Sequence, residues 1–194
     1  QTKELPKFAA GHSLGEYSAL VANGTFSLED CLKIVSKRAK YMDDAMAGIE
    51  GGMAAIMSNN PELDLANVVN EICKKLSTDN KFIQPVNYNS KNQIVIAGHK
   101  TLIDTCESEF KDQGVKRVIV LPVSIAAHST IMKSCSDKLD KLLNTKNWRN
   151  KFEFTYIGNL PRGFYFKNSK HKLPLSGEKL AEEISKNHVY LTAS

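Results

Sequence analysis

The chain has 194 residues, of which 42% are hydrophobic and 24% are charged. These proportions are ordinary for a soluble globular protein with one domain, or with one domain that carries a small inserted subdomain. No apolar run approaches the roughly 20 residues that a membrane-spanning helix needs. The net charge of +5 rests on lysines that are spread along the chain without interleaved aromatic residues. That pattern argues against a nucleic-acid-binding face and suits an acidic partner or a phosphorylated cofactor.

The four cysteines form neither a C-x-x-C pair nor the spacing of a metal site. Three of them fall on the apolar faces of predicted helices, where a free thiol behaves as a small hydrophobic side chain. We therefore expect buried free thiols and a reducing compartment. The five histidines form no metal-ligand set, so no metal is expected. The cysteines are Cys31, Cys73, Cys106 and Cys135.

The first element is a short apolar strand expected at residues 8–10, which leads directly into a G-x-S-x-G motif at residues 11–15 and then into a helical pattern. A strand, this motif and a helix, in that order, are typical of a nucleophile elbow, a turn that exposes a serine hydroxyl at a strand end. Ser13 is then the candidate nucleophile, and the backbone N–H of Leu14 is the candidate oxyanion donor. His12 is expected either to line the pocket or to support the turn. The alternative for Ser13 is a small residue filling an ordinary turn.

A second helix is predicted from Ser27 to about Ala47, because an acid three residues after Ser27 forms a variant of the capping box. One face of this helix carries three apolar side chains and Arg38. A guanidinium on an apolar face is unfavourable unless an anion pairs with it, and a free substrate carboxylate could be held there by a bidentate pair. The alternatives are an internal salt bridge, for instance to Glu16, or a side chain that reaches the surface. The apolar members of the face are Cys31, Val35 and Met42.

The pattern from Gly51 to about Val123 alternates strands and helices in the order βαββαβ. This order is the ferredoxin-like split unit. We expect it to fold as a small subdomain over residues 51–121, inserted into an α/β core formed by residues 1–50 and 122–194. The strands are expected at 53–57, 82–88, 93–97 and 117–123, and the helices at 61–76 and 100–113.

His128 follows the last of these strands and is the candidate general base. A satisfied core histidine is the usual explanation of a lone histidine, so its position alone does not assign the role. The other three histidines lie in polar, loop-like surroundings and are expected at the surface; they are His99, His171 and His188. The remaining elements are predicted as a helix at 131–143, a strand at 152–158, a basic connection at 159–174 and a helix at 176–186.

The seven residues Gly11–Tyr17, GHSLGEY, resemble the active-site motif of the malonyl-CoA:acyl-carrier-protein transacylases and of the related acyltransferase domains of fatty-acid and polyketide synthases. Further stretches are similar to the same family in the same order. The resemblance implies an α/β fold with an α/β-hydrolase-like parallel-sheet core and an inserted ferredoxin-like subdomain. The family's opening strand with its Gly-Gln-Gly loop and its closing Gly-Pro-Gly loop have no counterpart, so the chain is expected to match the central part of the family's domain. The further stretches are 38–45, 52–56, 85–90 with 93–99, and 122–129.

The resemblance also implies an activity: transfer of a malonyl group from malonyl-CoA to the phosphopantetheine thiol of acyl carrier protein, for fatty-acid biosynthesis. It implies Ser13 as nucleophile, His128 as base and Arg38 as the residue that binds the malonyl carboxylate. No cofactor is expected, and neither nucleic acid nor a membrane is an expected partner. The expected protein is a monomer in the bacterial cytoplasm or in a plastid or apicoplast stroma. The alternatives are a serine thioesterase or hydrolase with the same elbow, and a non-catalytic carrier-protein-binding fragment.

Overall fold

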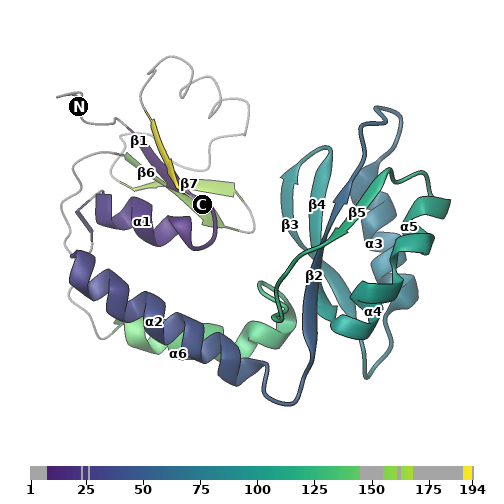
Figure 1. The fold of residues 1–194 in the computed structure, drawn as a ribbon. Helices are drawn as coiled ribbons and strands as arrows, with labels where there is room; N and C mark the ends of the chain where they lie inside the picture. Colours follow the sequence, from purple (N-terminus) through teal and green to yellow (C-terminus); the bar gives the residue numbers. More distant parts are fainter. Residues whose placement is uncertain are drawn as a thin grey trace. The chain divides into compact units, whose positions relative to one another are not determined.

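The computed structural model describes residues 8–22, 24–25, 27–144, 155–160, 163–167 and 190–193. The protein is a mixed α/β chain that divides into two compact units. The first unit comprises residues 1–37 and 144–194, and the second comprises residues 38–143. The described residues of each unit contain one four-stranded sheet (Figure 1). Among the described residues, no helix has both the length and the apolar composition that crossing a membrane requires.

The sheet of the first unit has the strand order β7-β6-β1-β8. Strand β1 pairs in parallel with both β6 and β8, and β7 pairs antiparallel with β6. The parallel arrangement around β1 was expected, whereas β7 lies in the stretch predicted as a connection and β8 was not predicted. The helix predicted at 176–186 lies outside the described residues. The strand bounds are β1 Phe8–Gly11, β6 Thr155–Leu160, β7 Gly163–Lys167 and β8 Tyr190–Ala193.

Two helices follow β1: α1 (Gly15–Ala22) and α2 (Leu28–Ala45). The predicted cap of α2 is confirmed, because the backbone N–H of Asp30 donates to Ser27 Oγ over 3.0 Å. The helix ends at Ala45, two residues before the predicted end.

The sheet of the second unit has the order β3-β4-β2-β5, and all its neighbouring strands are antiparallel. The predicted βαββαβ succession is present, with each strand close to its predicted position. Helix α3 begins at Leu65 rather than at Pro61, because Asp64 accepts a hydrogen bond from the Asn67 amide and caps the helix there. The bounds are β2 Gly51–Met57, α3 Leu65–Leu76, β3 Ile83–Ser90, β4 Gln93–His99, α4 Lys100–Thr105, α5 Glu107–Asp112, β5 Arg117–Val120, η1 Thr130–Met132 and α6 Lys133–Asn144.

This second sheet is buried on both faces, which explains why β2 reads as one continuous apolar run. Ala54 and Ile56 belong to a core cluster, centred on the fully buried Phe110, that contains side chains of α3, α4 and α5. These three helices cover one face of the sheet (Figure 1). Met53 and Ala55 belong to a second cluster on the other face, which we call the methionine cluster. Its buried members are Met42, Met46, Met53, Ala55, Val95, Ala97, Ala126, Ala127, Met132 and Cys135.

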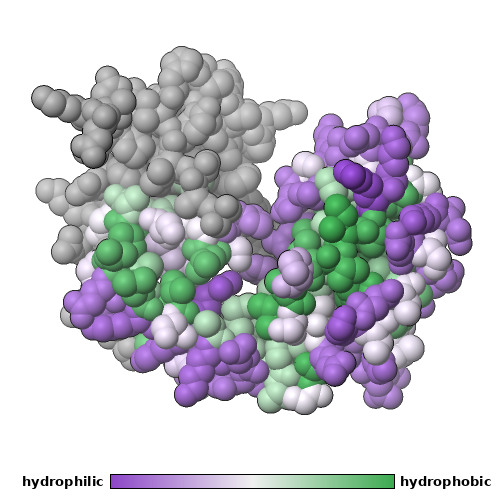
Figure 2. All heavy atoms as spheres, viewed as in Figure 1, coloured by the Kyte–Doolittle hydropathy of each residue, from purple (hydrophilic) through white to green (hydrophobic). Residues whose placement is uncertain are grey.

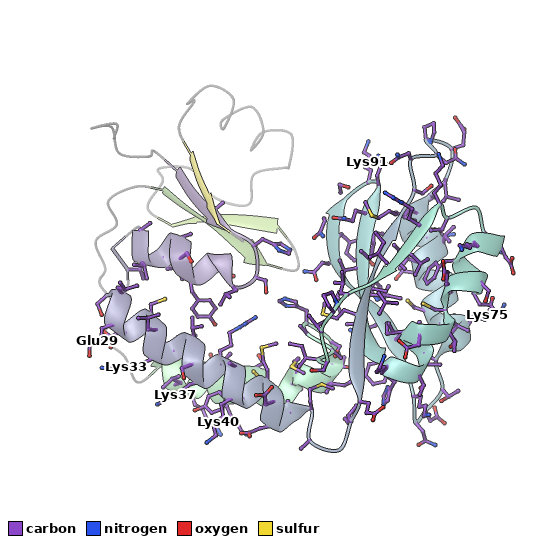
Figure 3. The ribbon with its side chains drawn as sticks, viewed as in Figure 1. Glu29, Lys33, Lys37, Lys40, Lys75 and Lys91 are labelled. Carbon is purple, nitrogen blue, oxygen red and sulfur yellow. The ribbon has the colours of Figure 1, made fainter. Side chains whose placement is uncertain are left out.

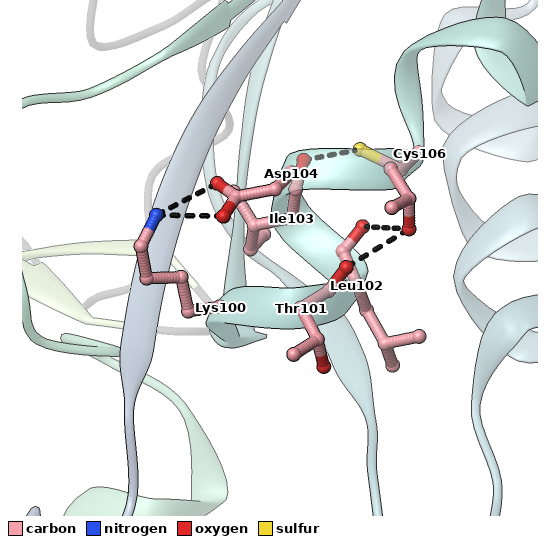
Figure 4. A network of polar contacts seen from close by, with 7 residues as sticks. Lys100, Thr101, Leu102, Ile103, Asp104 and Cys106 are labelled. Carbon is pink, nitrogen blue, oxygen red and sulfur yellow. Dashed lines mark hydrogen bonds and ion pairs between the residues drawn. The ribbon is translucent and has the colours of Figure 1, made fainter.

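The single helix predicted at 100–113 is two short helices that meet at Cys106 (Figure 4). Thr105 Oγ1 donates to the Thr101 carbonyl over 2.9 Å, and Cys106 Sγ donates to the Ile103 carbonyl over 3.2 Å. Side chains that bond back to carbonyls three or four residues earlier compete with the helix ladder and bend it. The ion pair between Lys100 and Asp104 spans one turn of α4 before the break. The prediction of one continuous helix was therefore wrong.

The outer edge of this sheet is apolar. Strand β5 ends the strand order, and the side chains of Ile119 and Val120, with that of Val123 just beyond, are between 43% and 48% exposed. Figure 2 shows a patch of apolar residues over this edge, bordered by hydrophilic ones. The edge is thus the most apolar exposed part of the second unit in this view.

The four cysteines are all free and buried, as predicted. Burial raises the pKa of Cys73 to about 12 and that of Cys106 to about 11, from an ordinary value of 9.0. A buried thiol with a raised pKa is protonated and shielded, so it is a poor nucleophile.

We predict that Ellman's reagent reacts slowly with the native chain at pH 8 and with four thiols after unfolding in urea. Unfolded thiols lose their protons near pH 9, whereas Cys73 and Cys106 keep theirs in the folded state. Their contribution to the free energy of unfolding is therefore present below pH 9 and is lost as the pH rises toward about 11 to 12. Rapid reaction of any thiol in the native chain would contradict this assignment.

Candidate functional site

Ser13 lies in a tight turn between β1 and α1, in a left-handed backbone conformation with φ of +52°. A non-glycine residue with positive φ is uncommon, and such strain is found mainly where the surrounding structure holds it. Here three consecutive backbone hydrogen bonds hold the turn: Gly15 N–H to His12 O over 2.9 Å, Glu16 N–H to Ser13 O over 3.2 Å, and Tyr17 N–H to Leu14 O over 3.1 Å. A strained serine between a strand and a helix is the geometry of a nucleophile elbow.

The first glycine of the motif is required by close backbone contact. A Cβ at position 11 would overlap the carbonyl group of Gly15 and the amide nitrogen of Glu16. Only a residue without a side chain lets the strand end approach the first turn of α1 this closely. The side chain of Ser13 is half-buried there, while those of His12 and Leu14 are exposed.

Arg38 lies on the same face of α2 as Cys31 and Met42 and is half-buried. Cys31 and Met42 on the same face are buried, at 6% and 7% exposure. On α6, Cys135 Sγ lies 4.0 Å from the Arg38 carbonyl oxygen. Burial raises the pKa of the Cys135 thiol, while the positive charges of Arg38 and Lys138 counteract that rise. The charge of Arg38 therefore acts on a buried thiol of the methionine cluster.

His128 lies in the loop between β5 and η1 and also has a left-handed backbone, with φ of +63°. Its side chain is exposed, whereas Ala127 before it and Ser129 after it are buried. The Ser129 amide and Ser129 Oγ both donate to the Ala126 carbonyl, over 3.3 Å and 2.7 Å. The loop thus turns sharply, with His128 outermost and both of its neighbours directed inward.

Gln84 contacts this loop, a residue that the sequence patterns did not single out. Its Oε1 accepts two hydrogen bonds from Thr130, one from the backbone N–H over 3.2 Å and one from Oγ1 over 3.0 Å. The two residues are 46 positions apart in the chain. No local signal could have linked them, because the contact depends on the register of β3 against β4.

The prediction that His99 is a surface residue was wrong. His99 ends β4 and is half-buried, its Nδ1 accepts the Phe82 N–H over 3.0 Å, and its ring meets the Phe82 ring edge-on at 5.2 Å. This histidine fastens the start of β3 to the end of β4. His171 and His188 lie outside the described residues. Among the described residues, no group of three or more His, Cys, Asp or Glu side chains could hold a metal ion.

The lysines of α2 lie on its exposed side and point away from the helix (Figure 3). Lys33 pairs with Glu29 over 2.5 Å, one helical turn away, and both side chains are largely exposed. Exposed pairs of this kind contribute little to stability, because solvent and salt screen the two charges. The lysines concerned are Lys33, Lys37 and Lys40.

The structure places the predicted site residues in two groups. His12, Ser13 and Leu14 lie together on the elbow, in the first compact unit. Arg38 and His128 belong to the second unit, where both border the methionine cluster: Ala127 precedes His128, and Cys135 contacts the Arg38 backbone.

We predict that Gly11→Ala abolishes the elbow, because a Cβ has no space beside the Gly15 carbonyl group. The variant should lose chemical labelling of Ser13 by a fluorophosphonate probe or should fail to fold, as circular dichroism would show. The matched control is Gly52→Ala, whose Cβ would lie an ordinary 3.5 Å from Ile103. Normal Ser13 labelling of the Gly11→Ala variant would contradict the proposed packing.

Similar proteins are known by sequence. The family described as acyl transferase domain matches residues 5–161. The malonyl CoA-acyl carrier protein transacylase of Staphylococcus aureus (strain MRSA252) is 46% identical over 144 residues, which are 74% of this chain and 45% of the relative. The protein of the same description from Salmonella typhimurium (strain LT2) is 41% identical over 139 residues, 72% of this chain and 43% of the relative. The chain therefore spans less than half the length of these relatives.

Solved structures resemble the whole fold. The crystal structure of MCAT from Streptococcus pneumoniae has a TM-score of 0.75 at 30% identity and is matched over 99% of this chain and 64% of its own. A malonyl-transacylase in complex with a type II PKS acyl-carrier protein has a TM-score of 0.71 at 30% identity, over 98% of this chain and 56% of its own. With the strained serine of the elbow in place and the family match covering most of the sequence, the chain belongs to the acyl transferase domain family.

Proposed function

We propose that this chain transfers a malonyl group from malonyl-CoA to the phosphopantetheine thiol of acyl carrier protein, as a malonyl-CoA:acyl-carrier-protein transacylase of fatty-acid biosynthesis. The observation that carries the proposal is the left-handed Ser13 in its G-x-S-x-G turn between β1 and α1. The choice of acyl group and acceptor rests on the relatives, such as the Staphylococcus aureus malonyl CoA-acyl carrier protein transacylase at 46% identity.

In the first half-reaction, Ser13 Oγ attacks the thioester carbonyl of malonyl-CoA while His128 takes its proton. The negative charge that develops on the carbonyl oxygen is stabilised by the backbone N–H of Leu14, because an amide at the start of a helix points at the group that an elbow serine attacks. The carbon–sulfur bond then breaks, and His128 returns the proton to the departing CoA thiolate. Malonyl-Ser13 and free CoA result.

Arg38 selects the acyl group in this proposal. Arg38 is half-buried, and its positive charge acts on the Cys135 thiol of the methionine cluster. The free carboxylate of a malonyl group fits the two-pronged donor geometry of arginine. A monocarboxylic acyl group such as acetyl has no second carboxylate for the guanidinium to bind.

In the second half-reaction, the phosphopantetheine thiol of acyl carrier protein attacks malonyl-Ser13, with His128 again moving the proton. The partner supplies the phosphopantetheine, so the chain itself needs no cofactor. Carrier proteins are acidic, and the exposed lysines of α2 suit such a partner electrostatically. One neighbouring structure is a malonyl-transacylase in complex with an acyl-carrier protein.

We also propose the finer fold: an α/β-hydrolase-like parallel-sheet core formed by residues 1–50 and 122–194, with a ferredoxin-like subdomain at residues 51–121. The parallel pairing of β1 with β6 and β8 supports the core, and the strand order β3-β4-β2-β5 supports the subdomain.

The buried free thiols suit a reducing compartment, the bacterial cytoplasm or a plastid or apicoplast stroma. We propose in addition that the protein is a monomer.

Mass spectrometry of the chain after mixing with malonyl-CoA tests the activity. We expect the mass of one malonyl group on a peptide that contains Ser13, discharged when acyl carrier protein is added. Ser13→Ala should remove this adduct and keep the fold, since alanine fits the same turn. Steady release of malonic acid without an adduct would indicate a hydrolase, and the absence of both would indicate a non-catalytic carrier-binding fragment.

Arg38→Ala should reduce the rate of malonyl loading by at least about tenfold, because truncating one partner of a buried charge pair costs about 2–5 kcal/mol and each 1.4 kcal/mol is a factor of ten. Loading from acetyl-CoA should stay the same or rise, since acetyl has no second carboxylate. Arg117→Ala, which removes an exposed arginine of β5, is the matched control and should change neither rate. Equal losses for both acyl groups would make Arg38 a structural residue.

A further inference from the structure

We propose that Gln84 is a positioning residue for His128, which it holds in place through Thr130. This inference deepens the proposed function, since it assumes that His128 is the base of the reaction. It starts from the left-handed backbone of His128, with φ of +63°. Such a conformation is unfavourable for a residue with a side chain and persists only where neighbouring contacts enforce it.

On one side of His128, the enforcing contacts are local. Ser129 is only 6% exposed, and its amide and hydroxyl both bond to the Ala126 carbonyl. These bonds close the turn around His128, and every partner in them belongs to the same short loop. The buried side chains of Ala126 and Ala127 pack the turn into the methionine cluster on the sheet. A hydrogen-bonding contact from another element adds direction to that packing.

Gln84 provides that contact. It is the second residue of β3 and pairs in register with Ala97 of β4, whose side chain belongs to the methionine cluster. Directly opposed residues of an antiparallel pair lie on the same face of the sheet. The Gln84 side chain therefore projects from the face of the sheet that the methionine cluster covers. Ala126 and Ala127 belong to that cluster.

The Gln84 amide group replaces a missing helix cap. Thr130 is the first residue of η1, and its N–H is one of the amides that a helix start leaves without an internal partner. The residue before it, Ser129, makes no side-chain capping hydrogen bond, and its hydroxyl donates to the Ala126 carbonyl instead. Gln84 Oε1 accepts from the Thr130 amide over 3.2 Å and from Thr130 Oγ1 over 3.0 Å. One carboxamide oxygen thus fastens the residue two positions after His128 to the sheet.

A displacement of the base by about 1 Å can slow a reaction on the order of 100-fold. If Gln84 acts by holding His128, its loss should affect the limiting rate of acylation and leave substrate binding unchanged. Gln84→Met keeps the length of the side chain and removes the acceptor oxygen. Gln84→Glu keeps an acceptor oxygen at the same position and should restore most of the rate.

The experiment measures the limiting rate of malonyl-Ser13 formation in the full chain, and the malonyl-CoA concentration at half of that rate. Gln84→Met should lower the limiting rate by about 10- to 100-fold without changing the half-saturating concentration. Gln93→Met is the matched control, because Gln93 Oε1 on the adjacent strand also accepts a side-chain hydrogen bond, from Asn89 Nδ2 over 3.0 Å. It should leave both quantities unchanged.

The decisive comparison repeats Gln84→Met in a His128→Ala background. A residue that acts through His128 should cause no further loss there, whereas a residue with a general structural role should cause the same fold loss as before. Equal losses in both backgrounds, or a Gln84→Met variant as fast as Gln93→Met, would overturn the proposal. Should Gln84→Met fail to fold, Thr130→Val removes one of the two donors to the same oxygen, and an unchanged limiting rate in that variant would also overturn it.

The same data separate this inference from the proposed function. If His128→Ala alone loads malonyl as fast as the natural chain, the base assignment is wrong and the role of Gln84 is wrong with it. If His128→Ala is slow while Gln84→Met is normal, only the role of Gln84 is wrong.

Discussion

The backbone contact between Gly11 and the first turn of α1 is the constraint on which the candidate site depends. The carbonyl of Gly15 and the amide of Glu16 occupy the space that a side chain at position 11 would need. Because these backbone groups approach so closely, the chain reverses direction within three residues, and Ser13 takes its left-handed conformation at the apex. The exposed strand end, the helix amides and the serine hydroxyl are thereby set in one place, before any substrate arrives.

The second unit meets a different requirement, which is a rigid support for an exposed loop. Its sheet is covered on both faces, by the cluster around Phe110 and by the methionine cluster. Close-packed interiors of this kind have low compressibility, so they deform little. The segment 126–130 is attached to this support by two buried alanines and by the bonds from Thr130 to Gln84. His128 can therefore be exposed to solvent while its backbone is held in an unfavourable conformation.

The two proposed catalytic residues, Ser13 and His128, both have positive backbone φ angles. The described part of the chain has no other non-glycine residue with this feature. Backbone strain of about 1–3 kcal/mol is retained mainly at functional sites, because elsewhere selection for stability removes it. The two strained residues lie in different segments of the chain. A single local distortion of the backbone therefore does not explain both. Their coincidence with the two residues that the motifs single out favours acyl-transfer chemistry over a purely structural use of either.

Much of the chain could be predicted because the signals are local. The glycines of the elbow, the cap formed by Ser27 and Asp30, the apolar face of α2 and the βαββαβ succession each depend on residues a few positions apart. Tertiary structure decided the rest: the bond from Phe82 to His99, the two-sided burial of β2 and the contact of Gln84 with Thr130. Those features depend on which strands pair and in which register, and a strand buried on both faces, such as β2, lacks the alternating pattern that would specify its register. The sequence therefore determined the local chemistry of Ser13, whereas only the folded sheet brought Gln84 to the loop that carries His128.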